Sequence, residues 1–370
     1  MNYEELKAAM NALPDTMTTA ERGRRYSAGE MVDHLPVSIG SEEAMADIYG
    51  YTSEQFRTDV DVAVDVLRKR AEDFDISGIR VGLKLNTIGE ALGSEILYPV
   101  KGVGSVSEYA LKNLSELEEK LKINPYKSPV YRRKLDECYV LKERLPDFPI
   151  STEVGGPITA VANIRPLELI LRDSIRHREA LRSLLSLAVE HSLAWVDMME
   201  REFGKMGCGI GDPVSSSTIL SRNQYLEFSL PYQKELIDGI ISIMGRQPKL
   251  HVCGRTRLLW QDMRELHVSC FSIDNIEDME EAKHVLGDRF CISGNVAPVD
   301  VMLRGTIDEV IEASRKCIGK AGDSPCGYIL GTGCQLPVGT PKENVEAFIY
   351  AARKYGRNAI KGKMPEGMIE

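Results

Sequence analysis

The chain has 370 residues, of which 43% are hydrophobic and 27% are charged, so it can bury a large core and is neither disordered nor fibrous. Its 46 Lys and Arg stand against 55 Asp and Glu, and no basic block is present that could follow a phosphate backbone. With a formal net charge of −9, the chain is not expected to bind nucleic acid.

Neither export nor membrane insertion is expected. Glu4 and Glu5 occupy the place at which a secretory signal is positively charged, and no apolar stretch follows them. The longest apolar runs are far shorter than the roughly 18 residues that cross a bilayer. Eight cysteines are too few for a disulfide scaffold in a chain of this length, so we expect a cytoplasmic protein whose thiols are reduced or bind metal.

Short apolar or β-branched segments alternate with helical stretches along the chain. After a helical stretch that ends near residue 35, eight segments predict strands, at 36–40, 80–86, 149–154, 206–212, 248–253, 269–274, 290–295 and 328–333. Four helices are expected to begin with the capping pattern of Ser or Thr followed three residues later by Glu or Gln, at Ser105–Glu108, Ser221–Gln224, Thr306–Glu309 and Thr340–Glu343. The last pattern also places Pro341 at the first helical position.

This alternation predicts an α/β fold, because parallel strands need long crossover connections and helices supply them. Eight such units predict a (β/α)8 TIM barrel, with the whole chain 1–370 as one domain. Residues 1–35 form a helical N-terminal extension, and the polar sequence at 100–148 forms an inserted helical segment or lid. A doubly wound nucleotide-binding sheet is disfavoured, because no glycine cluster completes G-x-G-x-x-G or G-x-x-x-x-G-K-[ST].

A candidate metal site emerges from two separate segments. Because side chains alternate along a strand, His251 and Cys253 point to the same side, and at the C-terminal end of a barrel strand that side faces the mouth. Cys334 ends the last predicted strand and would reach the same opening. One imidazole and two thiolates suit Zn²⁺ and leave a fourth position open, as catalytic zinc requires. The same His-Val-Cys sequence would also result if Cys253 only packed in the core and His251 only formed hydrogen bonds, so a purely structural role for the pair stays open.

The motifs around these residues occur together in one known family. They are His251-x-Cys253-Gly with Thr256, Ile292-Ser-Gly-Asn295-Val, Gly331-Thr-Gly-Cys334, Gly155-Gly156-Pro157-Ile-Thr159, Asp212 with Ser215–Ser217, and the opening Asp33-His-Leu-Pro36-Val. In this order they resemble the corrinoid-dependent zinc methyltransferase branch of the uroporphyrinogen decarboxylase superfamily, which includes methylcobalamin:coenzyme M methyltransferases and O-demethylase methyltransferases. The resemblance covers most of the chain and is weakest at 100–148.

The resemblance implies a (β/α)8 barrel, one zinc ion held by His251, Cys253 and Cys334, and a partner protein that carries the corrinoid (cobalamin). Decarboxylation of uroporphyrinogen is disfavoured, because residues 21–25 lack the Arg-Gln-Ala-Gly-Arg pattern of the decarboxylases. The zinc half of cobalamin-independent methionine synthase uses similar ligands, but its motif continues differently after the His-x-Cys pair.

Six further residues are candidates for the site. Asp212 and Asp274, at predicted strand ends, are expected to be catalytic by orienting the substrate or the groups around the metal, although helix caps or turns would also explain them. Glu153, Thr256, Asn295 and Gln335 are expected to bind the substrate, and Glu153 could also fill the fourth zinc position.

We therefore expect a methyltransferase that moves a methyl group between a small molecule and the cobalt of a corrinoid protein. Among the expected mouth residues only Arg255 is cationic, and an anionic substrate would need several cations. This favours a methoxylated aromatic donor over transfer from the methylcorrinoid to a thiol acceptor. Uroporphyrinogen decarboxylation and a non-catalytic barrel that only binds the corrinoid protein are further alternatives.

Overall fold

The computed structural model describes residues 1–369, which form two compact units. Met1–Ile76, Val100–Gly102 and the chain from Cys270 onward form the first unit, and Ser77–Pro99 with Val103–Ser269 form the second. Each unit contains four parallel strands connected through helices, together with one two-stranded antiparallel sheet.

In the first unit the parallel strands follow the order β2-β11-β10-β9, with bounds Val37–Ser38, Tyr328–Thr332, Cys291–Val296 and Cys270–Ser272. The antiparallel pair is β1 (Val32–His34) with β12 (Arg357–Ala359). The helices are α1 (Tyr3–Asn11), α2 (Thr19–Ser27), α3 (Glu42–Ile48), α4 (Ser53–Thr58), α5 (Val60–Phe74), α15 (Met279–Leu286), the π-helix η5 (Pro298–Leu303), α16 (Ile307–Ala321), α17 (Lys342–Tyr355) and the 3-10 turn η6 (Glu366–Met368).

In the second unit the order is β8-β7-β6-β3, with bounds Lys249–His251, Gly207–Gly211, Ile150–Gly155 and Ile79–Arg80. The antiparallel pair is β4 (Glu95–Leu97) with β5 (Ser105–Glu108). The α-helices are α6 (Thr87–Ala91), α7 (Leu117–Lys120), α8 (Pro129–Arg144), α9 (Pro157–Val161), α10 (Leu167–Arg176), α11 (Arg178–Phe203), α12 (Arg222–Phe228), α13 (Leu230–Met244) and α14 (Trp260–Met263). The 3-10 turns are η1 (Leu114–Glu116), η2 (Pro125–Lys127), η3 (Pro213–Ser215) and η4 (Arg257–Leu259).

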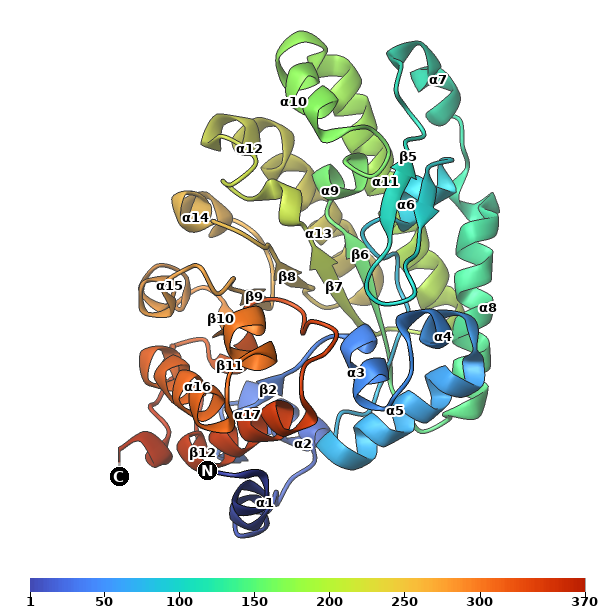
Figure 1. Cartoon of the computed structure of the whole chain (residues 1–370). Helices are drawn as coiled ribbons and strands as arrows, with labels where there is room; N and C mark the ends of the chain where they lie inside the picture. Colours follow the sequence, from blue (N-terminus) through green and yellow to red (C-terminus); the bar gives the residue numbers. More distant parts are fainter. Residues whose placement is uncertain (370) are drawn as a thin grey trace. The chain divides into compact units, whose positions relative to one another are not determined.

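The core of the second unit lies between its sheet and the helices. Strands β6, β7 and β8 run side by side, with α11 packed against β6 and α13 against β7 (Figure 1). On this side of the sheet Thr152 accepts a hydrogen bond from Trp195 Nε1 on α11 and donates one to the carbonyl of Val81. Alternate residues point to the opposite side, which we call the inner face, so the two faces of each strand have different chemistry.

These observations confirm the predicted α/β class and (β/α)8 barrel fold. All eight predicted strands are present within the expected segments or within one residue of them. The capping boxes predicted at Ser221 and Thr306 are present at the starts of α12 and α16. The expected helical extension is also present as α1 and α2, and most of 114–144 is helical in η1, α7, η2 and α8.

Two of the four predicted helix starts are wrong. Ser105–Glu108 forms strand β5, because its alternating side chains pair with β4 and no helical apolar stripe comes after them. Helix α17 begins at Lys342 with Pro341 as its N-cap, one residue later than predicted. The N-cap position has no side-chain cap, and the hydroxyl of Thr340, one residue before it, donates to the carbonyl of Pro337.

No helix within residues 1–369 combines the length and the apolar character that a bilayer span requires.

Candidate functional site

Strand β8 positions the His-x-Cys pair by simple alternation. Leu250 and Val252 are buried on the helix side, whereas His251 and Cys253 are partly exposed on the inner face. His251 lies opposite Gly211 of β7, which has no side chain that could cover it. The Nε2 atom of His251 lies 2.8 Å from the Sγ atom of Cys253, so the two potential ligands point to the same place, as predicted from their spacing.

Cys334 comes after strand β11 and a tight turn. Gly333 is required in this turn, because a Cβ atom there would lie 2.3 Å from the backbone nitrogen of Asn275. The hydroxyl of Thr332 donates to the carbonyl of Cys334 over 2.6 Å and closes the turn. The Cys334 side chain is partly exposed, in contrast to the buried residues that precede it.

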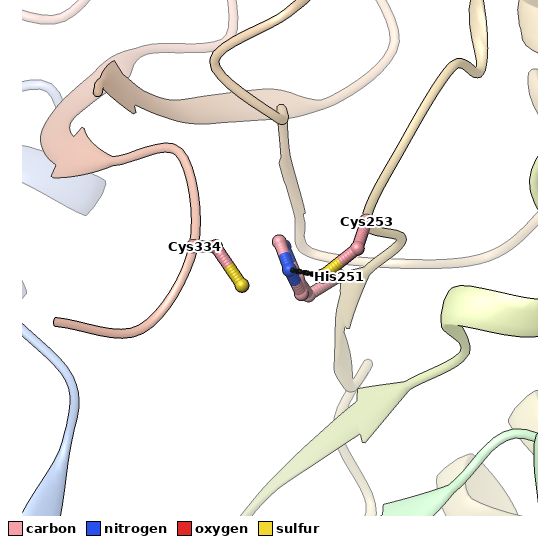
Figure 2. Close-up of side chains that lie close together, drawn as sticks. All are labelled: His251, Cys253 and Cys334. Atoms are coloured by element: carbon pink, nitrogen blue, oxygen red, sulfur yellow. Dashed lines mark hydrogen bonds between the residues drawn. The ribbon is translucent and has the colours of Figure 1, made fainter. Parts of the chain in front are cut away.

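Figure 2 shows the three side chains of the predicted metal site, and their ligand atoms all lie within 4.8 Å of one another. A tetrahedral zinc ion with Zn–N near 2.0 Å and Zn–S near 2.3 Å separates its ligand atoms by about 3.5 to 4 Å. The side chains therefore fit zinc in both chemistry and spacing, with small rotamer adjustments. Three ligands leave one coordination position for a substrate.

A second group of potential ligands has a different explanation. Asp15, Asp33 and His34 also bring their ligand atoms within 4.8 Å of one another. The guanidinium group of Arg22 lies 2.7 Å from Asp33 and 3.2 Å from Asp15, and Arg353 lies 2.6 Å from Asp15. Two guanidinium groups already neutralise the two carboxylates, so this group is an ion-pair network of the first unit and not a metal site.

Asp212 lies directly after β7 and is completely buried. Its Oδ1 accepts from the hydroxyl of Thr159 over 2.6 Å, and its Oδ2 accepts from Nε2 of Gln233 over 2.7 Å. Burial raises the pKa of this carboxyl group, and the hydrogen bonds oppose that rise. A catalytic role for Asp212 stays a prediction, but the contacts restrict it to an action through its neighbours.

The inner face of the second unit carries three cations that sequence reasoning did not place near the site, together with Glu153, which it did. Arg80 on β3 lies 3.8 Å from Glu153 on β6, and Lys249 alternates onto the same face two residues before His251. Lys84 lies beyond the end of β3, but the N–H groups of Val81 and Leu83 still bond to Ser151 and Glu153 of β6, so the extended backbone continues and places Lys84 on the side of Arg80. Strand β7 contributes only glycines to this face. The sequence contains a signal for the side on which each of these cations lies. With a period of two in 80–84 and in 249–253, Lys84 shares the side of Arg80, and Lys249 shares the side of His251.

The other predicted site residues are held by local hydrogen bonds. Asn295 on β10 uses its amide group to donate to the carbonyl oxygens of Asp274 and Glu277, at 3.0 and 2.8 Å. One carboxylate oxygen of Asp274 accepts from the backbone N–H of Ile276, so Asp274 also shapes the loop after β9. Their roles in catalysis and in substrate binding stay predictions.

Thr256 and Gln335 come shortly after the ligand residues Cys253 and Cys334 but differ in exposure. Thr256 is buried and its hydroxyl accepts from Nε1 of Trp260 over 2.9 Å, which fixes the start of η4 and α14. Gln335 is exposed. Substrate binding by either residue is likewise still a prediction.

The fold and these side chains define an α/β barrel protein with a candidate His/Cys metal centre. A model of the uroporphyrinogen decarboxylase (URO-D) family matches residues 18–355. The chain therefore belongs to this family.

Curated relatives cover nearly the whole chain. Methylcobamide:CoM methyltransferase MtaA of Methanosarcina barkeri is 25% identical over 338 residues, which are 88% of this chain and 95% of that protein. The Methylated-thiol–coenzyme M methyltransferase of Methanosarcina mazei is 25% identical over 351 residues, 91% of this chain and 90% of that protein. Both relatives are methyltransferases by name.

A solved structure supports the fold. A methyltransferase from Methanosarcina mazei aligns with 91% of this chain and 98% of its own, with a TM-score of 0.74 at 23% sequence identity.

Proposed function

We propose that this protein is a zinc- and corrinoid-dependent methyltransferase that exchanges a methyl group between a small molecule and the cobalt of a corrinoid-binding partner protein. The observation that carries the proposal is the set of His251, Cys253 and Cys334, whose ligand atoms lie within 4.8 Å of one another. The names of the relatives, which refer to methylcobamide and to methylated thiols, support the same reaction class.

In this proposal His251, Cys253 and Cys334 bind one Zn²⁺ per chain. A zinc ion in such a site is a Lewis acid that keeps a coordinated thiol deprotonated near neutral pH. Thiolate ligands and a thiol substrate both require reducing conditions, which is why we place the protein in the cytoplasm.

The charges on the inner face bear on the direction of transfer. The sequence favours a methoxylated aromatic donor, because Arg255 is the single cation that it places near the site. Arg80, Lys84 and Lys249 provide three more cations on the face that carries His251 and Cys253, against the single carboxylate of Glu153. The excess of positive charge on this face favours a substrate with an anionic end. Of the two candidate substrates this fits the thiol acceptor better than a neutral methoxylated ether, so we assign the acceptor as a small anionic thiol.

In the proposed reaction the thiolate sulfur attacks the methyl carbon bound to cobalt. The new S–CH3 bond forms as the Co–C bond breaks, and the cobalt keeps the bonding electron pair as Co(I). Glu153 and the cations would orient the substrate, whereas Asp212 and Asp274 would hold the surrounding loops. Transfer from a methoxylated aromatic ether to Co(I) remains the second candidate, because the same metal could polarise an ether oxygen.

Metal analysis tests the site directly. We expect about one zinc per chain in the wild type and a clear loss in Cys334→Ala, because two ligands hold zinc far less tightly than three. Cys326→Ala is the matched control, since Cys326 is another partly exposed cysteine and should leave the zinc content unchanged. Full zinc content in Cys334→Ala would remove this residue from the site.

The reaction is tested with the zinc-loaded protein and a methylated corrinoid protein. Thiols with and without an anionic group should demethylate the cobalt, the anionic ones faster, and His251→Ala should abolish the absorbance change. Formation of methyl-cobalt from methoxyarenes would support the second candidate instead. Binding of the corrinoid protein without any change at cobalt would indicate a non-catalytic partner, and coproporphyrinogen formation without corrinoid would indicate a decarboxylase.

A further inference from the structure

The segment that carries two of the proposed ligands lies mostly outside regular secondary structure. Strand β8 ends at His251, so Cys253 and the residues up to Arg255 lie beyond the strand ladder. Three residues of the loop at 212–218 form hydrogen bonds with this segment. The bonds are Asp212 N–H to His251 C=O at 2.9 Å, Ser217 N–H and Oγ–H to Arg255 C=O at 2.8 Å each, and Arg255 N–H to Thr218 Oγ1 at 3.0 Å.

Gly254 lets the two segments approach closely. Its φ angle of +85° lies in the left-handed region, and a Cβ atom there would be 2.9 Å from Thr218 Oγ1 and 3.2 Å from Ser216 Oγ. The residue next to Cys253 therefore has almost no freedom to move toward the loop. The residues on both sides of Cys253, namely His251, Gly254 and Arg255, are therefore in contact with the loop.

The loop itself is fixed by the buried Asp212 carboxylate. Besides the bonds from Thr159 and Gln233 to its two oxygens, the hydroxyl of Ser215 donates to the backbone carbonyl of Asp212 over 2.7 Å. Gln233 is oriented in turn by the hydroxyl of Tyr225, which donates to its Oε1 over 2.9 Å. All four partners are buried, so the network connects the loop to helices α9, α12 and α13.

We infer that residues 212–218 act as a clamp that sets the position of Cys253 relative to His251, and that Asp212 is the positioning residue of this clamp. This inference rests on the proposed function for the metal, but the clamp consists of contacts within the second unit. Groups behind metal ligands are known to tune metal affinity by holding the ligands in place.

Replacement of Asp212 by Asn tests the clamp with little change in shape. One carboxylate oxygen becomes an NH2 group that faces an N–H donor, either the backbone N–H of Thr159 or Nε2 of Gln233. We expect the zinc affinity, measured by chelator competition, to fall roughly 10- to 100-fold. In Co²⁺-substituted protein, the sulfur-to-cobalt charge-transfer band should weaken, since it reports thiolate geometry.

Asp173→Asn is the matched control. Asp173 is also a buried carboxylate, but its two oxygens accept from Nε and Nη2 of Arg165 at 2.6 and 3.4 Å. This variant should lose stability while keeping the wild-type zinc affinity and Co²⁺ spectrum. A wild-type affinity and spectrum in Asp212→Asn, together with lowered stability, would overturn the inference and leave Asp212 a purely structural residue.

A second variant tests the clamp without any metal. Thr218→Val removes the acceptor of the Arg255 N–H, so amide exchange at Arg255 in the metal-free protein should accelerate roughly 10-fold, as expected for one lost hydrogen bond. Thr58→Val, at another exposed threonine, is the control. Unchanged exchange at Arg255 would overturn the clamp whether or not zinc binds, whereas absence of zinc from the wild type would overturn the proposed function alone.

Discussion

His191 on α11 is a completely buried base whose Nδ1 lies 3.0 Å from the hydroxyl oxygen of Tyr131. Burial lowers the pKa of this imidazole from 6.5 to about 4, because desolvation penalises its charged form. Between these two values the unfolded chain binds a proton that the folded protein excludes. The free energy of unfolding should therefore decrease as the pH falls from 6.5 to 4, by up to about 3 kcal/mol.

This prediction is checked by urea unfolding at several pH values in that range. His191→Asn should have a flatter pH dependence than the wild type, and the difference between the two proteins removes contributions from carboxyl groups. The control His267→Asn, at an exposed histidine on the surface, should keep the wild-type slope. Identical slopes for the wild type and His191→Asn would show that His191 does not stay neutral in the fold.

At the scale of single residues, the sequence predicted the His-x-Cys geometry well, because two residues on one strand share a side by alternation alone. The sequence was a poorer guide to the surroundings of the Asp212 carboxylate. A carboxylate at a strand end can face a substrate or a set of buried donors, and the difference depends on Thr159 and Gln233, which are 53 and 21 residues away. Such partners have no local signature.

The same capping pattern gave different elements at two places in the chain. Thr306 accepts from the backbone N–H of Glu309 at the start of α16, whereas Ser105 lies on the exposed strand β5. Thr306→Ala should therefore lower the free energy of unfolding by about 1 kcal/mol, as for other N-cap residues. Ser105→Ala should stay within about 0.5 kcal/mol of the wild type.

Urea denaturation of the two variants at one pH measures this difference. An equal loss in both variants would mean that Ser105 caps a helix, in contrast to its place on strand β5.

At the scale of elements, the two capping patterns differ in the residues on the C-terminal side of the cap. After Thr306 the buried residues Ile307, Val310 and Ile311 recur with helical spacing, whereas after Ser105 the side chains alternate.

For the whole molecule, the single-domain organisation predicted from the sequence has a direct spectroscopic test. The chain contains two tryptophans, Trp195 and Trp260, and both lie in the second unit. Tryptophan fluorescence therefore reports on that unit, whereas far-UV circular dichroism reports on the helices of both units. If the chain folds as one domain, the two signals should change together during urea denaturation.

Separate transitions in the two signals would contradict the single-domain prediction. The order of the segments makes cooperative unfolding the expected result. The first unit needs both Met1–Ile76 and the chain from Cys270 onward, so it cannot form until the second unit has been made between them. Neither unit corresponds to a simple half of the sequence.

The sequence by itself determined the properties that depend on neighbours along the chain. The eight strands, the caps at Ser221 and Thr306, and the common side of His251 and Cys253 all arise from spacings of two or three residues along the chain. Tertiary structure alone decided which distant groups meet, because contacts across many residues depend on how the strands and helices pack. The burial of Asp212, its clamp on the Cys253 segment, and the contact of Arg80 on β3 with Glu153 on β6 are of this second kind.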